Sequence, residues 1–234
     1  MTDKFPYLNE NDFFVFPSVE SATSEGIVAA GGNLSPGMLL SAYRQGIFPW
    51  FSYNEAILWW SPDPRLVLFP SDIYISKTMK KVMKRSVFSF TFDTAFPEVI
   101  SRCGNIPRKE QDGTWITESM IEAYIRLHKL GYAHSVEVWQ DNDLCGGLYG
   151  VSLGRCFFGE SMFSIVSNAS KAALIFLART LSANQFRFID CQVYTEHLET
   201  LGAVSIPRSR FLELLKESIL FPDIYGDWNE KIDF

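Results

Sequence analysis

The chain has 234 residues, enough to bury a substantial core as one large domain or two smaller ones. Hydrophobic residues make up 47% of the sequence and charged residues 21%, which is ordinary for a soluble globular protein. The formal net charge of −6 excludes a broadly basic surface, so any contact with nucleic-acid phosphates must come from a local basic patch.

The cysteine pattern indicates a reduced protein, because it shows neither CxxC spacing nor the density of a disulfide scaffold. The N-terminus lacks the apolar core of a signal peptide, and no stretch approaches 18 uncharged apolar residues. We therefore expect a cytoplasmic protein that does not contact a membrane.

Residues 1 to about 65 are rich in glycine, proline and aromatic residues. Ser35 and Pro36 supply an N-cap and a first-turn proline, which predict a helix over 36–45. The aromatic segment that follows contains three prolines and cannot be helical throughout. We expect a small N-terminal domain over 1–65 and a second domain over 66–234.

The second domain begins with two predicted helices. One is amphipathic and spans 75–86, and the other follows Thr117 and ends near Gly131. Alternating apolar residues then predict three strands that pair in sequence order. These strands span 134–139, 144–152 and 155–163.

A helix over 168–183 is apolar nearly all round, so we expect it to be buried. A strand over 186–193 and a short helix over 194–202 follow. A helix between two strands makes a crossover, hence one parallel pair in an otherwise antiparallel sheet. The order predicts an α+β fold similar to that of the GCN5-related N-acetyltransferases (GNAT-like).

Asp190 and Gln192 alternate along the predicted strand 186–193, so we expect both side chains, with Phe186 and Phe188, on one face. An acid and an amide beside an aromatic wall are costly to bury without polar partners. A structural hydrogen-bonded pair and a functional pair are equally compatible with this spacing.

Glu160 lies on one face with Met162 by the same alternation, among apolar neighbours. A carboxylate in such surroundings usually meets a cation, from the protein or from a ligand. Spacing alone favours a salt bridge to a nearby Lys or Arg over a ligand.

The helix at 75–86 carries five cations and no acid within nine residues of an acidic chain. Most charged helix faces are simply solvated, but this density also fits phosphate binding. The cations are Lys77, Lys80, Lys81, Lys84 and Arg85.

The three histidines show no metal-ligand spacing, so we expect no metal site. No GxSxG, Walker A, HExxH or GxGxxG motif is present. The residues alone therefore suggest no standard hydrolase, nucleotide or dinucleotide site.

Several longer stretches resemble the leucyl/phenylalanyl-tRNA–protein transferase family, from about residue 13 to residue 215. WWSPDPR, GESMFS and IDCQ are together the most specific of these motifs. The others are GGNLSPGMLLSAYRQGIFPW, TWITESMIEAYIRLHKLGYAHSVEVW, LCGGLYGVSLGRCFFGESMFS and NASK.

The resemblance implies transfer of Leu or Phe, and also Met, from aminoacyl-tRNA to an acceptor protein with an N-terminal Arg or Lys. The new N-terminal residue marks the acceptor for degradation. The resemblance implies no metal and no cofactor, and we expect a monomer.

The resemblance also implies a role for each matching residue. Asp190 and Gln192 match the catalytic pair, and Glu160 matches the carboxylate that holds the acceptor's basic side chain. Strand alternation favours Phe158 over Phe157 as a pocket residue, so a bulge is needed there. The positions implied to bind the aminoacyl-adenosine are Trp50, Trp115, Leu148, Phe157, Met162 and Leu177.

One departure from the family pattern is visible, because Ile165 stands where Arg is expected after GESMFS. Details of acceptor-end binding are affected, but not the reaction class.

Two rival functions stay open. An acetyl-CoA-dependent acetyltransferase needs a glycine-rich phosphate loop, which the segment SIVSNASK lacks. A tRNA-binding module without catalysis would not need Asp190, Gln192 or Glu160.

Overall fold

A three-stranded antiparallel sheet forms the core of a small N-terminal unit in the computed structural model, which describes residues 10–105 and 116–234. Its strand order is β1 (Ile27–Ala30), β3 (Leu58–Trp60), β2 (Phe48–Pro49). The predicted helix is confirmed as α1 (Pro36–Arg44), since Ser35 caps it by accepting a hydrogen bond from the Met38 amide. A short 3₁₀ helix, η1 (Val19–Ser21), precedes the sheet.

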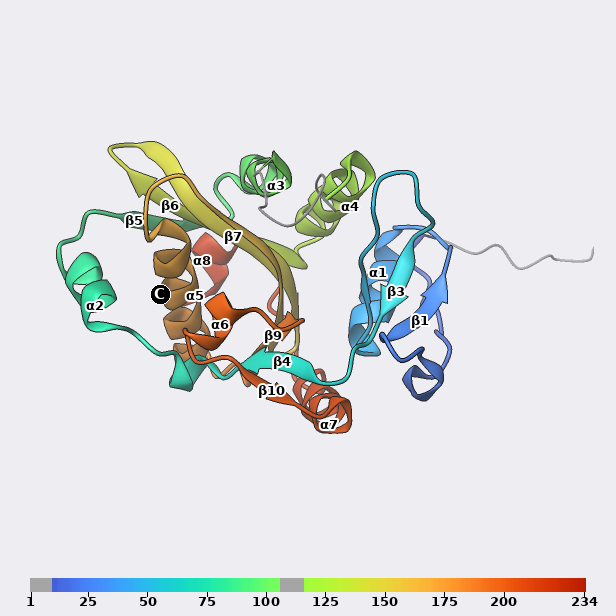
Figure 1. The fold of residues 1–234 in the computed structure, drawn as a ribbon. Helices are drawn as coiled ribbons and strands as arrows, with labels where there is room; N and C mark the ends of the chain where they lie inside the picture. The colour runs from blue at the N-terminus through green and yellow to red at the C-terminus, as the bar shows by residue number, and fades with distance from the viewer. Residues whose placement is uncertain (1–9, 106–115) are drawn as a thin grey trace, which may run out of the picture.

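A seven-stranded sheet organises the larger unit (Figure 1). Its spatial order is β10, β4, β9, β8, β7, β6, β5. The strands are β4 (Arg65–Leu68), β5 (Ser89–Phe92), β6 (Ala133–Gln140), β7 (Asp143–Leu153), β8 (Cys156–Ser164), β9 (Phe188–Gln192) and β10 (Val204–Ile206).

Only β8 and β9 run parallel within this described sheet, and α5 (Ala169–Ala183) connects them. The predicted crossover in an otherwise antiparallel sheet is therefore confirmed. The apolar sequence of α5 is explained by its place, because it packs on β6, β7 and β8 and most of its residues are buried. The fold is α+β with a small N-terminal domain, as the sequence predicted.

Helices cover both faces of the large sheet (Figure 1). One face carries α3 (Phe96–Asn105) and α4 (Glu118–Lys129), and the other carries α5 and α8 (Trp228–Lys231). Two large apolar clusters correspond to these faces. The remaining elements are η2 (Pro70–Asp72), α2 (Lys77–Lys84), α6 (Glu196–Glu199) and α7 (Arg208–Ser218).

The elements that the sequence predicted in the second domain are present, with ends shifted by a few residues. The sequence did not predict the N-terminal sheet, β4, β5, β10, α3, α7 or α8. The missed strands have two to four residues, too few to display a period of two. They form because long-range pairing, as between β4 and β9, satisfies their backbone groups.

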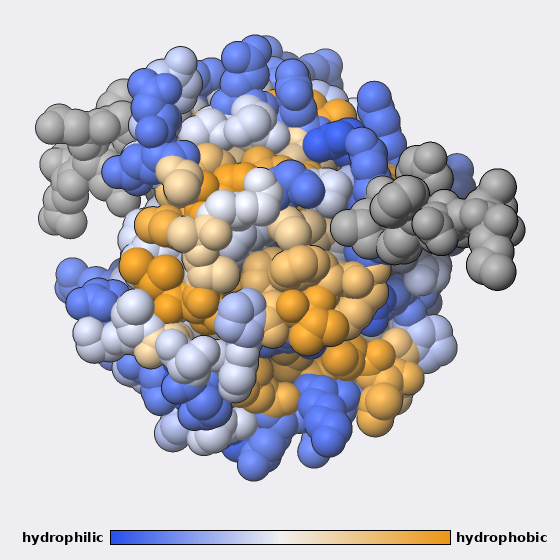
Figure 2. Space-filling view, turned by 90° about the vertical axis from the view of Figure 1, so that its right-hand side faces the viewer, coloured by the Kyte–Doolittle hydropathy of each residue, from blue (hydrophilic) through white to orange (hydrophobic). Residues whose placement is uncertain are grey.

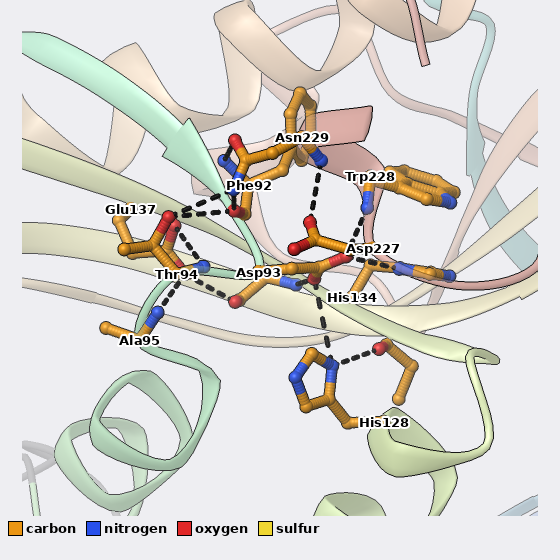
Figure 3. A network of polar contacts seen from close by, with 12 residues as sticks. Phe92, Asp93, Thr94, Ala95, His128, His134, Glu137, Asp227, Trp228 and Asn229 are labelled. Atoms are coloured by element: carbon orange, nitrogen blue, oxygen red, sulfur yellow. Dashed lines mark hydrogen bonds and ion pairs between the residues drawn. The ribbon is translucent and has the colours of Figure 1, made fainter. Parts of the chain in front are cut away.

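A buried polar network joins β5 and β6 to the C-terminal α8 (Figure 3). Asp93, which has a φ of 54°, accepts hydrogen bonds from the His134 ring at 2.8 Å and from the Trp228 amide at 2.9 Å. The His134 ring also stacks on Trp228, with ring centroids 4.0 Å apart. Burial lowers the pKa of His134, although the hydrogen bond and the charge of Asp93 oppose this shift.

Glu137 belongs to the same network and is fully buried. Its carboxyl accepts hydrogen bonds from the Thr91 hydroxyl at 2.6 Å and from the Ala95 amide at 3.3 Å. Burial raises the pKa of this carboxyl. The network therefore fixes the start of α3 and the C-terminal end of the chain on one sheet edge.

Apolar side chains spread across the face that carries the N-terminal unit (Figure 2). Near the start of the described chain, Phe13, Phe14 and Val15 are exposed. The Phe14 and Phe16 rings touch at 5.0 Å, and Phe16 packs on the buried Trp59. The N-terminal segment thus reaches the core of its unit through Phe16 and leaves its other apolar residues at the surface.

Candidate active site

A cavity of about 720 Å³ opens where β2 of the N-terminal unit meets β7, β8, β9, α5 and α6. Most of the residues that the sequence assigned to an active site line it, although they come from both units. They are Trp50, Leu148, Phe157, Glu160, Met162, Leu177 and Gln192. Trp115 lies outside the described residues, and Asp190 does not line the cavity.

The wall opposite the polar groups is apolar. Leu148 and Met162 face each other as partners across β7 and β8, and Phe157 lies on the same side. Leu174 and Leu177 project from α5 at helical spacing and complete the wall. The arrangement can bury an aliphatic or aromatic side chain of ligand size.

A bulge in β8 explains why Phe157, and not Phe158, lines the cavity. Tyr149 pairs with Ser161 and Gly150 pairs with Gly159, which leaves Glu160 as the extra residue. A bulge re-aims side chains on either side of it. The bulge that the sequence analysis required is therefore confirmed, and it delivers Glu160 into the cavity.

The Glu160 carboxyl is 8% exposed and is held by three neutral donors. The Tyr43 hydroxyl donates to Oε1 at 2.7 Å, and the Tyr124 hydroxyl donates to Oε2 at 3.0 Å. The Gln192 side-chain amide donates to Oε1 at 2.8 Å. Burial raises the pKa of Glu160 to about 7, although the three hydrogen bonds oppose the shift.

The salt bridge that spacing favoured for Glu160 is not found. Within residues 10–105 and 116–234, no basic side chain forms an ion pair with this carboxyl. Sequence reasoning missed Tyr43 and Tyr124, which lie in the apolar stripes of α1 and α4 and are fully buried. The usable signal was that a buried tyrosine hydroxyl requires a polar partner.

Gln192 ends β9 with a φ of 64°, in the left-handed region. This turn carries its side chain into the cavity, where Nε2 donates to Glu160. Since a carboxylate only accepts hydrogen bonds, the amide oxygen of Gln192 is the end left for a ligand.

Asp190 occupies a different position from the one that alternation predicted. Ile189 and Cys191 line the cavity, so Asp190 faces the opposite side of β9 and is fully buried. Both of its carboxylate oxygens accept hydrogen bonds from Arg65, at 2.8 and 2.7 Å. The expected shared face with Gln192 is wrong, because the left-handed turn at Gln192 breaks the alternation.

Arg65 was not identified from the sequence, although it ends the WWSPDPR motif. Its guanidinium lies between the rings of Phe48 and Phe211, 4.7 and 4.5 Å from their centroids. Asp190 in turn accepts a hydrogen bond from the Gln192 backbone amide at 2.9 Å. The ion pair thereby fixes the turn that presents the Gln192 side chain.

Ser76 caps the basic helix α2 by accepting a hydrogen bond from the Met79 amide, and the helix packs against α5 through Met79. Its cationic residues are exposed and do not line the cavity. Among the described residues none of them forms an ion pair. They are Lys77, Lys80, Lys81, Lys84 and Arg85.

Nowhere among the described residues do three or more His, Cys, Asp or Glu side chains lie together as a metal site requires. No helix in this part of the chain is both long and apolar enough to span a membrane.

Comparison with known proteins defines the family. The family model for the leucyl/phenylalanyl-tRNA protein transferase matches residues 67–216, and the model for the N-terminal domain of the same family matches residues 32–63. The chain therefore belongs to the leucyl/phenylalanyl-tRNA–protein transferase family. It is an aminoacyltransferase that moves an aminoacyl group from tRNA to proteins.

Individual relatives agree with this assignment. A leucyl/phenylalanyl-tRNA–protein transferase of Syntrophus aciditrophicus is 58% identical over 92% of this chain and 90% of the relative. Transferases of the same name from Desulfatibacillum aliphaticivorans and Syntrophobacter fumaroxidans are each 53% identical over 92% of both chains. Among solved structures, a GCN5-related N-acetyltransferase from Kribbella flavida aligns with a TM-score of 0.36 and 9% identity, over 73% of this chain and 60% of that one.

Proposed function

We propose that this cytoplasmic, monomeric enzyme transfers Leu, Phe or Met from aminoacyl-tRNA to proteins with an N-terminal Arg or Lys, and so marks them for degradation. One observation carries the proposal: an apolar cavity of about 720 Å³ contains a buried carboxyl, Glu160, that no basic side chain of the described residues neutralises. The apolar wall suits the donor side chain, and the carboxyl suits a cationic acceptor.

The donor amino acid is proposed to lie against Leu148, Phe157, Met162 and Leu177. A Leu, Met or Phe side chain fills such a wall, whereas the shorter Val leaves part of it empty. The loss should be about 1–3 kcal/mol per missing group. Trp50 and Trp115 are proposed to hold the terminal adenosine, and the α2 cations are proposed to hold tRNA phosphates.

The acceptor's basic side chain is proposed to meet Glu160, which brings its α-amine near Gln192. An ion pair in this dry site would satisfy a charge that is otherwise expensive to bury. A neutral acceptor leaves the carboxyl without that partner, so it should be used poorly.

The reaction needs no further activation, because an aminoacyl ester already has a good leaving group. The acceptor's amine nitrogen attacks the ester carbonyl carbon, the bond from that carbon to the ribose oxygen breaks, and a proton passes from the amine to the ribose oxygen. A terminal α-amine has a pKa of about 8, so roughly a tenth is neutral near pH 7. Gln192 accepts a hydrogen bond from the amine and orients its lone pair.

Asp190 is proposed to act through Gln192 and not on the substrate. Its charge is already neutralised by Arg65, and its contact to the site is the Gln192 backbone amide. Asp190 and Arg65 are therefore positioning residues. The large sheet's strand β4 begins at Arg65, so the change from the small sheet to the large one lies within a residue of the proposed boundary between 1–65 and 66–234.

The test of this proposal compares Glu160→Gln with wild type on peptides that begin with Arg, Lys or Gly. Transfer from Phe-tRNA to the Arg and Lys peptides should fall in the variant through a raised KM for the peptide. Binding of Phe-tRNA should stay nearly unchanged, because Glu160 faces the acceptor. Equal loss of Phe-tRNA binding would assign Glu160 a structural role.

A further inference from the structure

Glu160, which lines the cavity, forms a closed triangle of three polar side chains with Tyr43 and Tyr124. Each tyrosine hydroxyl lies within hydrogen-bond distance of a different carboxyl oxygen of Glu160. The two hydroxyl oxygens are also in short contact with each other. The triangle therefore contains three oxygen–oxygen contacts between groups from α1, α4 and β8.

Counting protons shows that an ionised Glu160 does not satisfy this triangle. The two hydroxyl groups supply two protons for three contacts, so one pair of oxygens would face each other with lone pairs only. A third proton on Oε2 of Glu160 resolves the conflict. That oxygen then donates to Tyr124, Tyr124 donates to Tyr43, and Tyr43 donates to Oε1.

We infer that Tyr43, Tyr124 and Glu160 share a third proton and release it when a cationic acceptor side chain binds to Glu160. This inference rests on the proposed function of Glu160 as the acceptor site. It makes the two tyrosines specificity-determining residues, because the contact between their hydroxyls fits a protonated Glu160 and must open when a cation holds Glu160 in its ionised form.

The surrounding charges agree with a proton on Glu160. Asp190 lies on the neighbouring strand and disfavours a second negative charge, although Arg65 already pairs with it. Tyr149 packs edge-on against the ring of Tyr124, at 5.6 Å between centroids. Burial raises the pKa of Glu160 to about 7, within reach of ordinary assay conditions.

The other titratable groups near the cavity keep their usual neutral forms at pH 7. Burial raises the pKa of both tyrosines well above 10, so the carboxyl is the group that loses the proton. Burial also raises the pKa of the Cys191 thiol and lowers that of His197, which line the cavity from β9 and α6. Neither competes with Glu160 for the released proton.

Cation binding should change the triangle in a defined way. With Glu160 ionised, both tyrosines donate to its oxygens, and nothing holds the two hydroxyl oxygens together. Their contact should lengthen. A ligand that carries the same side-chain shape without charge should leave the proton in place, since it offers no compensation for a buried carboxylate.

The first experiment measures proton release by calorimetry on the full-length enzyme. The ligand is a short peptide with N-terminal Arg, and the control peptide carries the uncharged isostere citrulline. Both peptides have the same α-amine, so its titration cancels in the comparison. Titrations at pH 6, 7 and 8 in buffers of different ionisation enthalpy give the number of protons released on binding.

The Arg peptide should release nearly one proton more than the citrulline peptide at pH 6, about half at pH 7 and almost none at pH 8. Its Kd, relative to that of the citrulline peptide, should be about tenfold weaker at pH 6 than at pH 8. Equal proton release by both peptides at pH 6 would overturn the inference.

Infrared difference spectroscopy tests the proton directly. Free wild-type enzyme at pH 6 should show a protonated-carboxyl band that Glu160→Gln removes and that the Arg peptide abolishes. Glu137, the other buried carboxyl with a raised pKa among the described residues, does not line the cavity, so its band cancels in the difference. If Glu160→Gln does not fold, the spectral difference that the Arg peptide induces in wild type still tests whether a carboxyl loses its proton.

Failure of the inference and failure of the proposed function give different results. If the Arg peptide receives Phe from Phe-tRNA but causes no proton release and no infrared change at pH 6, only the proton inference falls. If neither Arg nor Lys peptides are preferred over the citrulline peptide as acceptors, the assignment of Glu160 falls, and the inference falls with it.

Discussion

Arg65 and Asp190 form a bidentate ion pair in which both side chains are completely buried, and Asp190 also holds the backbone amide of Gln192. The pair lies behind the strand whose last residue reaches the cavity. Two charged side chains that do not line the cavity thus define the position of the Gln192 amide group, which does.

Removal of the carboxylate should destabilise the fold. Asp190→Ala leaves the Arg65 guanidinium buried without its partner, which should cost about 3–5 kcal/mol of unfolding free energy. Urea denaturation measures the loss. The control is Glu213→Ala, which breaks the exposed pair with Arg210 and should stay within about 0.5 kcal/mol of wild type. Similar losses in both variants would contradict the importance of the buried pair.

Gln192→Ala should slow single-turnover transfer about 10- to 100-fold. The loss should be this modest because the variant loses the orientation of the amine, whereas loss of a strong general base would cost more. Affinity for aminoacyl-tRNA should change little. Gln192→Gly serves as a control for the backbone, since glycine adopts the φ of 64° without strain. Equal rates for the Ala and Gly variants would show that the missing side chain causes the loss.

Gln192→Glu should also be slow. The substitution removes the amide donor and places a second carboxyl within hydrogen-bond distance of Glu160. Two like charges so close together raise the pKa of one of the two carboxyls. A Glu variant as fast as wild type would instead support a general base at this position. Rapid-quench measurement with pre-bound Phe-tRNA gives the rate.

Charge reversal at Lys80, Lys81 and Lys84 should raise the KM for aminoacyl-tRNA at low salt by about tenfold or more and flatten its salt dependence. Turnover of a minimal aminoacyl-adenosine donor should stay the same, because that donor has no stem to contact α2. A matched variant reverses the same number of exposed lysines elsewhere, at Lys129, Lys216 and Lys231. If both triple variants raise the KM for aminoacyl-tRNA equally, the effect comes from the overall charge of the protein and not from a tRNA-binding surface on α2.

The network in Figure 3 should make stability depend on pH. The pKa of folded His134 is lowered from 6.5, so just below pH 6.5 the unfolded chain binds a proton that the folded chain excludes. The unfolding free energy should therefore fall as pH drops through this range. His134→Gln keeps a donor for Asp93 and should lack this loss. The raised pKa of Glu137 acts in both proteins and cancels in the comparison. Identical pH profiles from denaturant titrations would contradict this account.

Patterns that extend over many residues predicted the fold well. The apolar surface of α5 and the alternation in β6 to β8 predicted the helix, the meander of strands and the crossover. Each of these elements repeats its hydrophobic pattern over eight or more residues. Short strands such as β4 and β10 carry no such period. Their pairing depends on chain segments more than 100 residues apart.

The site was predictable where the family resemblance named a residue, and less so where geometry decided its neighbours. Strand alternation placed Asp190 beside Gln192, but one left-handed residue reversed that relationship. Tyr43 and Tyr124 were missed because a buried tyrosine looks like a core residue in sequence, and Arg65 was missed because a charged residue gives no sign that it will be buried. The partner of a buried polar group becomes known only when distant elements meet.

The most direct test mixes the purified enzyme with Phe-tRNA and an equimolar pair of peptides that differ only in an N-terminal Arg or citrulline. Mass spectrometry follows both products in one reaction. We expect addition of one phenylalanine residue to the N-terminus of the Arg peptide, at least about tenfold faster than to the citrulline peptide. Transfer at equal rates to both, or to neither, would contradict a cation-selecting acceptor site at Glu160.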